Sequence, residues 1–132
     1  SKVCKEVLRV LKPGGIFCCS TYGTSHMQEI TSLVQEFDNR IMLSGEKLYE
    51  KFGLENGPQI LEKFFSQIEL RKYDDEIIIN QAEPIIEYII SCHGNQNQYV
   101  LDRYHDFKNF VEKHLTKPFH ITKDAGIFIC RN

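Results

Sequence analysis

The most constraining feature of the chain is a stop signal between a helix and a strand. Residues 12–15 read Lys-Pro-Gly-Gly and follow residues 1–11, whose apolar side chains recur at helical spacing while the charged ones lie largely opposite. Pro13 cannot continue a helix, and the two glycines allow the backbone to reverse. The sequence therefore predicts an amphipathic helix that ends near Lys12.

Residues 16–19, which come next, form a continuous apolar run that the polar Ser20 and Thr21 terminate. Short unbroken apolar runs are typical of strands that are covered on both faces of a parallel sheet. We therefore expect a buried parallel strand here. Helix, turn and strand in this order indicate a protein of the α/β class.

Further along the chain, helical spacing, capping signals and β-branched runs predict the remaining elements. Helices are expected at 25–38, with Ser25 and Gln28 as a capping box, and at 56–66, 83–92 and 100–115. Residues 39–57 form a lid-like connection. Strands are expected at 68–73 and 77–79, broken near two aspartates, and at 119–122 and 127–130, separated by a turn or bulge at Gly126.

Composition narrows the range of functions. A chain of 132 residues with 42% hydrophobic residues can build one globular core. Its 18 acidic and 16 basic residues are scattered and give a net charge of -2, which does not favour nucleic acid as a partner. No apolar run approaches the ~20 residues that span a bilayer, so we expect no membrane partner and a cytoplasmic protein. The five cysteines are expected to be buried free thiols.

Three blocks of the sequence, in order, resemble class I S-adenosylmethionine-dependent methyltransferases. Within this class the chain resembles the methyltransferases of type 11. They are residues 7–15 with the apolar strand after them, residues 52–57 before a Phe-rich helix, and residues 119–129. The resemblance implies an α/β fold, the C-terminal half of a Rossmann-like methyltransferase fold. Its sheet would be mixed, with the last strand antiparallel and helices packed on it. Residues 1–132 would be a single partial domain with a helical lid-like insertion around 24–66.

The resemblance also implies which part of the enzyme this chain represents. In the family, S-adenosylmethionine lies over a glycine-rich turn after the first strand, whereas residues 7–15 correspond to the helix and turn before the fifth strand. We therefore expect no cofactor-binding residue in this chain, and we expect the chain alone to be inactive. It would supply the substrate wall and lid of an enzyme that methylates a small molecule. The alternative is a non-catalytic α/β binding or interaction module.

Candidate site residues follow from the position of the first strand. Ligands of open parallel sheets collect beyond the carboxyl ends of strands, which places Thr21, Tyr22 and His26 at the substrate side. Tyr22 could stack on or hydrogen-bond a substrate. His26 could assist deprotonation, or it could be an ordinary solvated histidine in the first turn of a helix.

Other chemistry-bearing residues are read as structural. Cys92 and His93 have no clustered partner, so neither a nucleophile nor a metal site is expected, and no catalytic residue is assigned.

We also expect a homodimer or higher assembly through the strand edge near residues 16–20 and the helix at 3–11, because a truncated sheet leaves an apolar edge unpaired.

Overall fold

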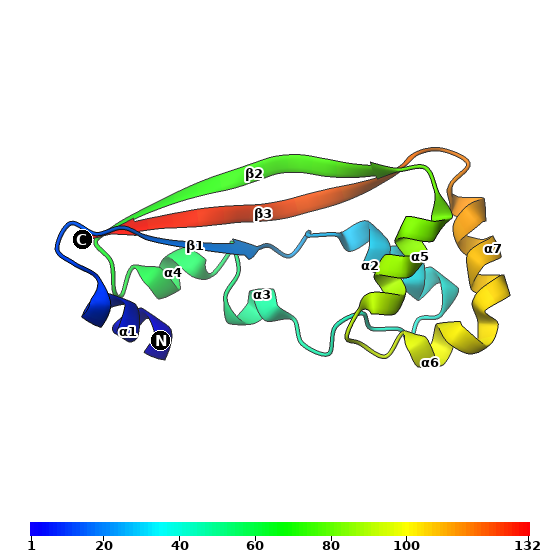
Figure 1. Cartoon of the computed structure of the whole chain (residues 1–132), viewed down its shortest axis with the longest axis horizontal. Coiled ribbons are helices and arrows are strands. Elements are labelled where there is room, and N and C mark those ends of the chain that lie inside the picture. The colour runs from blue at the N-terminus through cyan, green and yellow to red at the C-terminus, as the bar shows by residue number, and fades with distance from the viewer. The chain divides into compact units, whose positions relative to one another are not determined.

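The computed structural model describes all residues from Ser1 to Asn132, which form two compact units. Unit 1 comprises Ser1–His26, Leu48–Asp74 and Asp124–Asn132, and unit 2 comprises Met27–Lys47 and Asp75–Lys123. The elements, shown in Figure 1, are in chain order α1 (Lys2–Val10), β1 (Phe17–Tyr22), α2 (Gln28–Phe37), α3 (Leu48–Lys51), α4 (Gly57–Leu61), β2 (Gln67–Ile79), α5 (Ala82–Ser91), α6 (Asn97–Val100), the 3-10 helix η1 (Leu101–Arg103), α7 (Tyr104–His114) and β3 (Phe119–Arg131).

The sheet has three strands in the order β1-β3-β2. The last strand, β3, pairs antiparallel with β1, so that Phe17 lies opposite Cys130 and Tyr22 lies opposite Ala125. The arrows of β2 and β3 also point in opposite directions (Figure 1). The expectation of an α/β chain with an antiparallel last strand is therefore confirmed. No neighbouring pair of strands in residues 1–132 is parallel, so a mixed sheet is not observed.

The expectation that residues 16–19 form a strand buried on both faces is wrong. Ile16 is 51% exposed and Cys18 is exposed, whereas Phe17 and Cys19 are half-buried. This alternation arises because α1 and α4 both lie on one side of the strands in unit 1 (Figure 1). An apolar run alone did not distinguish one covered face from two.

The helix, the turn and the strand at the start of the chain form as the stop signal predicts. The Ser1 hydroxyl accepts a hydrogen bond from the Cys4 N–H at 3.5 Å, and α1 ends at Val10. Gly14 has a φ of +74°, a conformation that only glycine adopts without strain. The Gly15 N–H donates to the Lys12 carbonyl at 2.8 Å and closes the turn that leads into β1.

The core of unit 1 lies between the strands and the helices α1 and α4. It is built from six buried side chains: Cys4, Leu54, Leu61, Phe65, Phe128 and Cys130. The helix α4 ends at Leu61 rather than near residue 66, because the N–H groups of Phe64 and Phe65 both donate to the Leu61 carbonyl in a closing turn. This turn places the Phe65 ring against Phe17, with ring centroids 5.6 Å apart.

Unit 2 is a helical cluster built on the remaining parts of β2 and β3. The helices α5 and α7 lie side by side, and α2 also packs on α7 (Figure 1). Twelve buried side chains form the core: Ile30, Leu33, Val34, Ile41, Ala82, Ile85, Ile86, Ile89, Val100, Phe107, Val111 and Ile121. The expected last long helix is divided into α6, η1 and α7. None of the helices has the length and apolar character needed to cross a membrane.

The expected capping box at Ser25 does not form. The helix α2 begins at Gln28, and Met27 before it adopts the left-handed conformation with a φ of 54°. The first turn is held by Glu29, whose carboxylate accepts hydrogen bonds from the Thr122 N–H at 2.9 Å and from the Thr122 hydroxyl. A partner far along the chain therefore replaces the local cap.

The Glu29 carboxylate is expected to make unit 2 sensitive to acid. Burial raises the pKa of Glu29, but the hydrogen bonds from Thr122 lower it. The net result is a pKa below the usual 4.5. A lowered folded-state pKa contributes stability above the unfolded-state pKa, and this contribution is lost as the pH falls through the folded value. We expect Glu29→Gln to remove about 1 kcal/mol at neutral pH and to flatten the loss of stability below about pH 4.5.

Urea unfolding of unit 2 between neutral and acidic pH measures this effect, and Glu87→Gln, on an exposed position of α5, is the matched control. An acid slope that is the same in Glu29→Gln as in the unchanged chain would contradict the prediction.

Two predicted interruptions of strands are absent. The strand β2 continues through Asp74, Asp75 and Glu76, because an edge strand can direct charged side chains into solvent. The strand β3 continues through Gly126, which pairs with Thr21. A Cβ at Gly126 would lie 3.0 Å from the Arg71 carbonyl oxygen, so this glycine serves close packing rather than a turn.

Candidate functional site

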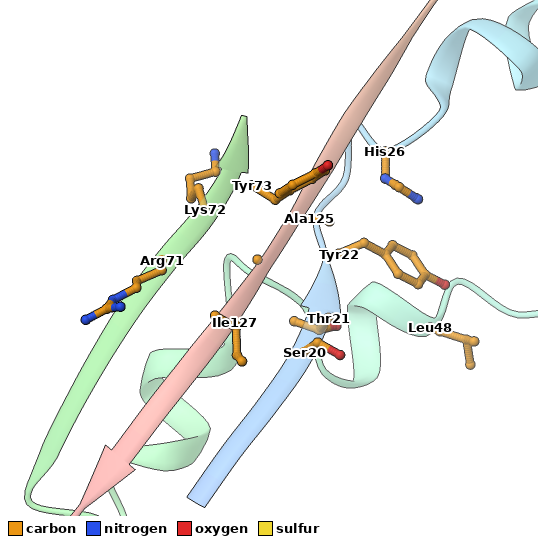
Figure 2. Close-up of a pocket in the computed structure, with 11 residues that line it drawn as sticks. Ser20, Thr21, Tyr22, His26, Leu48, Arg71, Lys72, Tyr73, Ala125 and Ile127 are labelled. Carbon is orange, nitrogen blue, oxygen red and sulfur yellow. The ribbon is translucent and has the colours of Figure 1, made fainter. Parts of the chain in front are cut away.

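A cavity of about 700 Å³ lies in unit 1 at the carboxyl end of β1. Figure 2 shows the residues that line it, which come from β1, the loop after it, the start of α3, and the strands β2 and β3. They are Ser20, Thr21, Tyr22, His26, Leu48, Arg71, Lys72, Tyr73, Ala125, Gly126 and Ile127. The structure thus brings the three sequence-predicted residues Thr21, Tyr22 and His26 to one cavity, together with side chains of β2 and β3 that the sequence analysis did not single out.

Two aromatic neighbours hold the Tyr22 side chain at the cavity. Its ring stacks on the His26 ring with centroids 5.1 Å apart, and it meets the Tyr49 ring edge-on at 6.5 Å. In the view of Figure 2 the Tyr22 ring lies between His26 and Leu48. A ring fixed on two sides is a rigid wall with little rotational freedom to lose when a ligand binds.

His26 lies in the loop before α2 rather than in its first turn. Its Nδ1 atom accepts a hydrogen bond from the Asp124 N–H at 3.2 Å. A backbone N–H can only donate, so Nδ1 carries no proton and the neutral ring carries its proton on Nε2. A base role for His26 at Nδ1 would require this hydrogen bond to break.

Thr21 has a structural partner at the cavity wall. Its hydroxyl donates to the Phe52 carbonyl at 2.7 Å, and the Leu54 N–H donates to the Tyr22 carbonyl at 3.3 Å. These two bonds tie the segment before α4 to the end of β1. Because the Thr21 hydroxyl is already engaged, its contribution to ligand binding is to hold this part of the wall in place.

Two carboxylates fix the loop between β1 and α2. Glu55 accepts from the Thr24 N–H at 3.0 Å, and Asp124 accepts from the Ser25 N–H at 3.2 Å. Gly23 provides the space for both, since a Cβ there would lie 2.2 Å from the Asp124 Oδ2 and 2.6 Å from the Glu55 Oε1. Neither anchor could be predicted from the sequence, because residues distant along the chain carry no local signal of their contact.

The two cations of the cavity lining come from β2 and are paired with carboxylates. Arg71 donates to Glu69 at 2.8 Å, and this bond raises the pKa of Arg71 and lowers that of Glu69. Lys72 lies 3.6 Å from the Asp124 carboxylate, the same group that anchors the loop. Both cations are more than half exposed, so they contribute positive potential at the rim without a large desolvation penalty.

The thiols of Cys19 and Cys92 are poorly suited to nucleophilic chemistry at neutral pH. Burial, together with the neighbouring thiols of Cys130, Cys4 and Cys18, raises the pKa of Cys19 to about 11. Burial also raises the pKa of Cys92, although its hydrogen bond to the Tyr88 carbonyl partly opposes this. A raised pKa keeps the thiol protonated, and the thiolate is the reactive form. The expectation of buried free thiols is wrong for Cys18, which is free but exposed.

A scan of the sequence against known protein families found no matching family, and a search of curated proteins found no match.

Proposed function

We propose that residues 1–132 are the C-terminal part of a class I S-adenosylmethionine-dependent methyltransferase that acts on a small-molecule acceptor. The observation that carries the proposal is the cavity at the carboxyl end of β1, lined by Thr21, Tyr22 and His26. This strand follows the Lys-Pro-Gly-Gly turn that resembles the turn before the fifth strand of the family. The same end of the strand is where ligands of open α/β sheets bind.

The arrangement of the strands gives a second line of support. The resemblance places the last strand of the sheet antiparallel and beside the fifth strand. In the structure the full length of β1 pairs antiparallel with β3, from Phe17 opposite Cys130 to Tyr22 opposite Ala125. The first and third sequence blocks, far apart in the chain, are therefore neighbours in the sheet.

The residues present do not fit a cofactor-binding turn. The connection from β1 to α2 carries a single glycine, Gly23, and two carboxylates close on it. The connection from β2 to α5 consists of Asn80 and Gln81 and carries no glycine. We therefore assign S-adenosylmethionine binding to another part of the parent enzyme, and we assign no chemical step to this chain.

The contribution of this chain is to bind and orient the acceptor. The fixed Tyr22 ring, the His26 ring stacked on it and the apolar side chains of Leu48 and Ile127 provide contact area for the acceptor. Orientation of the reacting atoms supplies a large part of the rate enhancement of group-transfer enzymes. We therefore assign to residues 1–132 the substrate wall and lid, which hold the acceptor in position.

The test is transfer of a labelled methyl group from S-adenosylmethionine to a panel of small-molecule acceptors by the parent protein. We expect Tyr22→Ala to raise the KM for the acceptor about 5-fold, because loss of the ring removes ~1 kcal/mol of contact, and to leave the KM for S-adenosylmethionine unchanged. Tyr104→Ala, at an exposed tyrosine of α7, is the matched control and should change neither constant.

Two results would contradict the proposal. One is a parent protein that transfers no methyl group from S-adenosylmethionine, whether or not it binds this cofactor, which would favour the non-catalytic binding module. The other is micromolar binding of S-adenosylhomocysteine to residues 1–132 alone in calorimetry, because this chain is proposed to lack the cofactor site.

A further inference from the structure

The cavity at the carboxyl end of β1 is floored by one face of the sheet. Phe128 in β3 lies in the core between the strands and the helices, so Ala125 and Ile127 project from the other face. Tyr22 lies opposite Ala125 in the ladder of β1 and β3, and residues opposite each other direct their side chains to the same face. Tyr22, Ala125 and Ile127 therefore share this face, which we call the cavity face.

The register of β2 against β3 follows from two contacts in unit 1. The Lys72 Nζ atom lies 3.6 Å from the Asp124 Oδ1 atom, and a Cβ at Gly126 would lie 3.2 Å from the Leu70 Cδ1 atom. Each strand advances two residues between these contacts, as it does in an antiparallel ladder. The residue of β2 midway between the contacts therefore lies opposite the residue of β3 midway between them.

These two residues are Arg71 and Ala125, and they complete a row across the sheet. Tyr22 on β1, Ala125 on β3 and Arg71 on β2 are neighbours on the cavity face, and all three line the cavity (Figure 2). Adjacent strands lie about 4.8 Å apart, so the backbones of Tyr22 and Arg71 are about 10 Å apart with the Ala125 methyl group between them. The row is a slot with a ring at one end, a guanidinium at the other and a small side chain as its floor.

The Tyr22 end of the slot favours an aromatic ligand. The Tyr22 ring is fixed by the rings of His26 and Tyr49, and the Tyr73 ring of β2 also lines the cavity. Aromatic rings in stacked or edge-on contact gain more than the burial of their area provides. A planar ring that lies over Ala125 makes such contact, whereas a puckered saturated ring does not.

The Arg71 end of the slot favours a carboxylate. The Arg71 Nε–H donates to the Glu69 Oε1 atom at 2.8 Å, and neither terminal amino group of Arg71 has a hydrogen-bond partner within residues 1–132. The terminal edge of a guanidinium presents two parallel N–H donors, which match the two oxygens of a carboxylate. The charge of Glu69 opposes a doubly charged phosphate more than a carboxylate. No acidic side chain lines the cavity, so nothing there attracts a cationic ligand.

We propose that the acceptor bound at this cavity is an aromatic carboxylic acid, whose ring lies over Ala125 against Tyr22 and whose carboxylate pairs with Arg71. Ala125 is then a specificity-determining residue, because a larger side chain at this position fills the slot. This assignment rests on the proposed function, because it names the class of the acceptor.

The test is an NMR titration of residues 1–132, which needs no methyl transfer. The probes are benzoate, its saturated counterpart cyclohexanecarboxylate and its neutral counterpart benzamide. We expect benzoate to shift the Tyr22 and Ala125 amide signals and to bind at least about 5-fold more tightly than either counterpart, because one lacks the aromatic ring and the other lacks the charge. Equal affinities for the three probes, or no binding of benzoate at millimolar concentration, overturn the proposal.

Substitutions at the floor and at the charged end separate the two parts of the slot. Ala125→Leu is expected to weaken benzoate binding at least ~10-fold, whereas the smaller change Ala125→Ser should preserve most of the affinity. Arg71→Gln is expected to lower the affinity for benzoate to that for benzamide and to leave the affinity for benzamide unchanged. Arg9→Gln, at an exposed arginine of α1 that pairs with Glu6, is the matched control and should change neither.

Both substitutions can overturn the proposal. Unchanged benzoate binding in a folded Ala125→Leu variant does so, because the slot is then not the binding site. Arg71→Gln does so if it weakens benzoate and benzamide equally, or neither of them. Arg71 is more than half exposed, so its substitution keeps the test valid if Ala125→Leu fails to fold by circular dichroism.

The failure of this proposal is distinguishable from the failure of the proposed function. Selective binding of benzoate to residues 1–132, together with a parent protein that transfers no methyl group, contradicts the proposed function alone. Methyl transfer by the parent protein to acceptors that lack an aromatic ring or an acid group, with a KM that Arg71→Gln does not change, overturns only the aromatic acid as the acceptor.

Discussion

Replacing Gly94 with alanine is expected to destabilise unit 2 by ~3 kcal/mol or more. A Cβ at this position would lie 1.7 Å from the Met42 carbonyl oxygen and 2.6 Å from the Leu43 carbonyl carbon. These are backbone atoms, so no side-chain rotation relieves the overlap. The loops around Gly94 and Met42 would have to separate.

The separation would also break the hydrogen bonds that hold the two loops together. The Asn95 N–H donates to the Met42 carbonyl at 2.9 Å, its Oδ1 accepts from the Met42 N–H at 2.6 Å, and its Nδ2 donates to the Arg40 carbonyl at 2.9 Å. Each bond contributes ~1 kcal/mol. The steric and the hydrogen-bond losses therefore act together.

Urea unfolding followed by circular dichroism measures the change in the free energy of unfolding. Gly45→Ala is the matched control, because a Cβ at Gly45 meets no atom within 4 Å and the substitution lies in the same unit. A midpoint for Gly94→Ala within error of that for Gly45→Ala would show that the two loops do not approach as described.

The second large effect is expected in unit 1, where Phe128→Ala should remove about 3–5 kcal/mol of stability. The Phe128 side chain is 0% exposed and packs beside the Phe52 ring, with centroids 5.9 Å apart. Gly57 leaves room for it, since a Cβ at Gly57 would lie 2.6 Å from two atoms of the Phe128 ring. Truncation leaves a cavity in the middle of this core.

The thiols of Cys4 and Cys130 report on the same cavity, because both belong to the core around Phe128. We expect Phe128→Ala to increase the rate at which a disulfide reagent modifies these two thiols, along with a lower unfolding midpoint. Ile127→Ala is the control, because Ile127 directly precedes Phe128 in β3 but is 37% exposed. This variant should leave both thiols as protected as before. Equal thiol reactivity in the two variants would contradict the packing of Phe128.

The sequence predicts best those features whose causes are local. Pro13 and the glycines after it end α1 and start the turn to β1 wherever the chain later goes. The grouping of Tyr22 and His26 at one cavity also follows from local order, since both come shortly after the strand. Asp124 and Glu55, in contrast, lie at the site only because β3 returns beside β1 and because α3 and α4 close under it.

Features that depend on tertiary contacts could not be predicted in the same way. Ser25 and Gln28 have the spacing of a capping box, but the Ser25 N–H bonds to Asp124 and the first turn of α2 bonds to Thr122 through Glu29. Asp74 and Asp75 have the composition of a turn, yet pairing with β3 extends β2 through them. In each case contacts between distant parts of the chain outweigh a local preference of about 1 kcal/mol.

The order of the strands has a consequence for synthesis on the ribosome. The central strand of the sheet, β3, is the last of the three along the chain, and β1 and β2 touch only through it. At ~5–20 residues per second, roughly 5–20 s pass between the emergence of β1 and that of β3. During that interval the uncharged β1 has no pairing partner among the later residues of the chain, and its backbone groups on the β3 side stay exposed until β3 arrives.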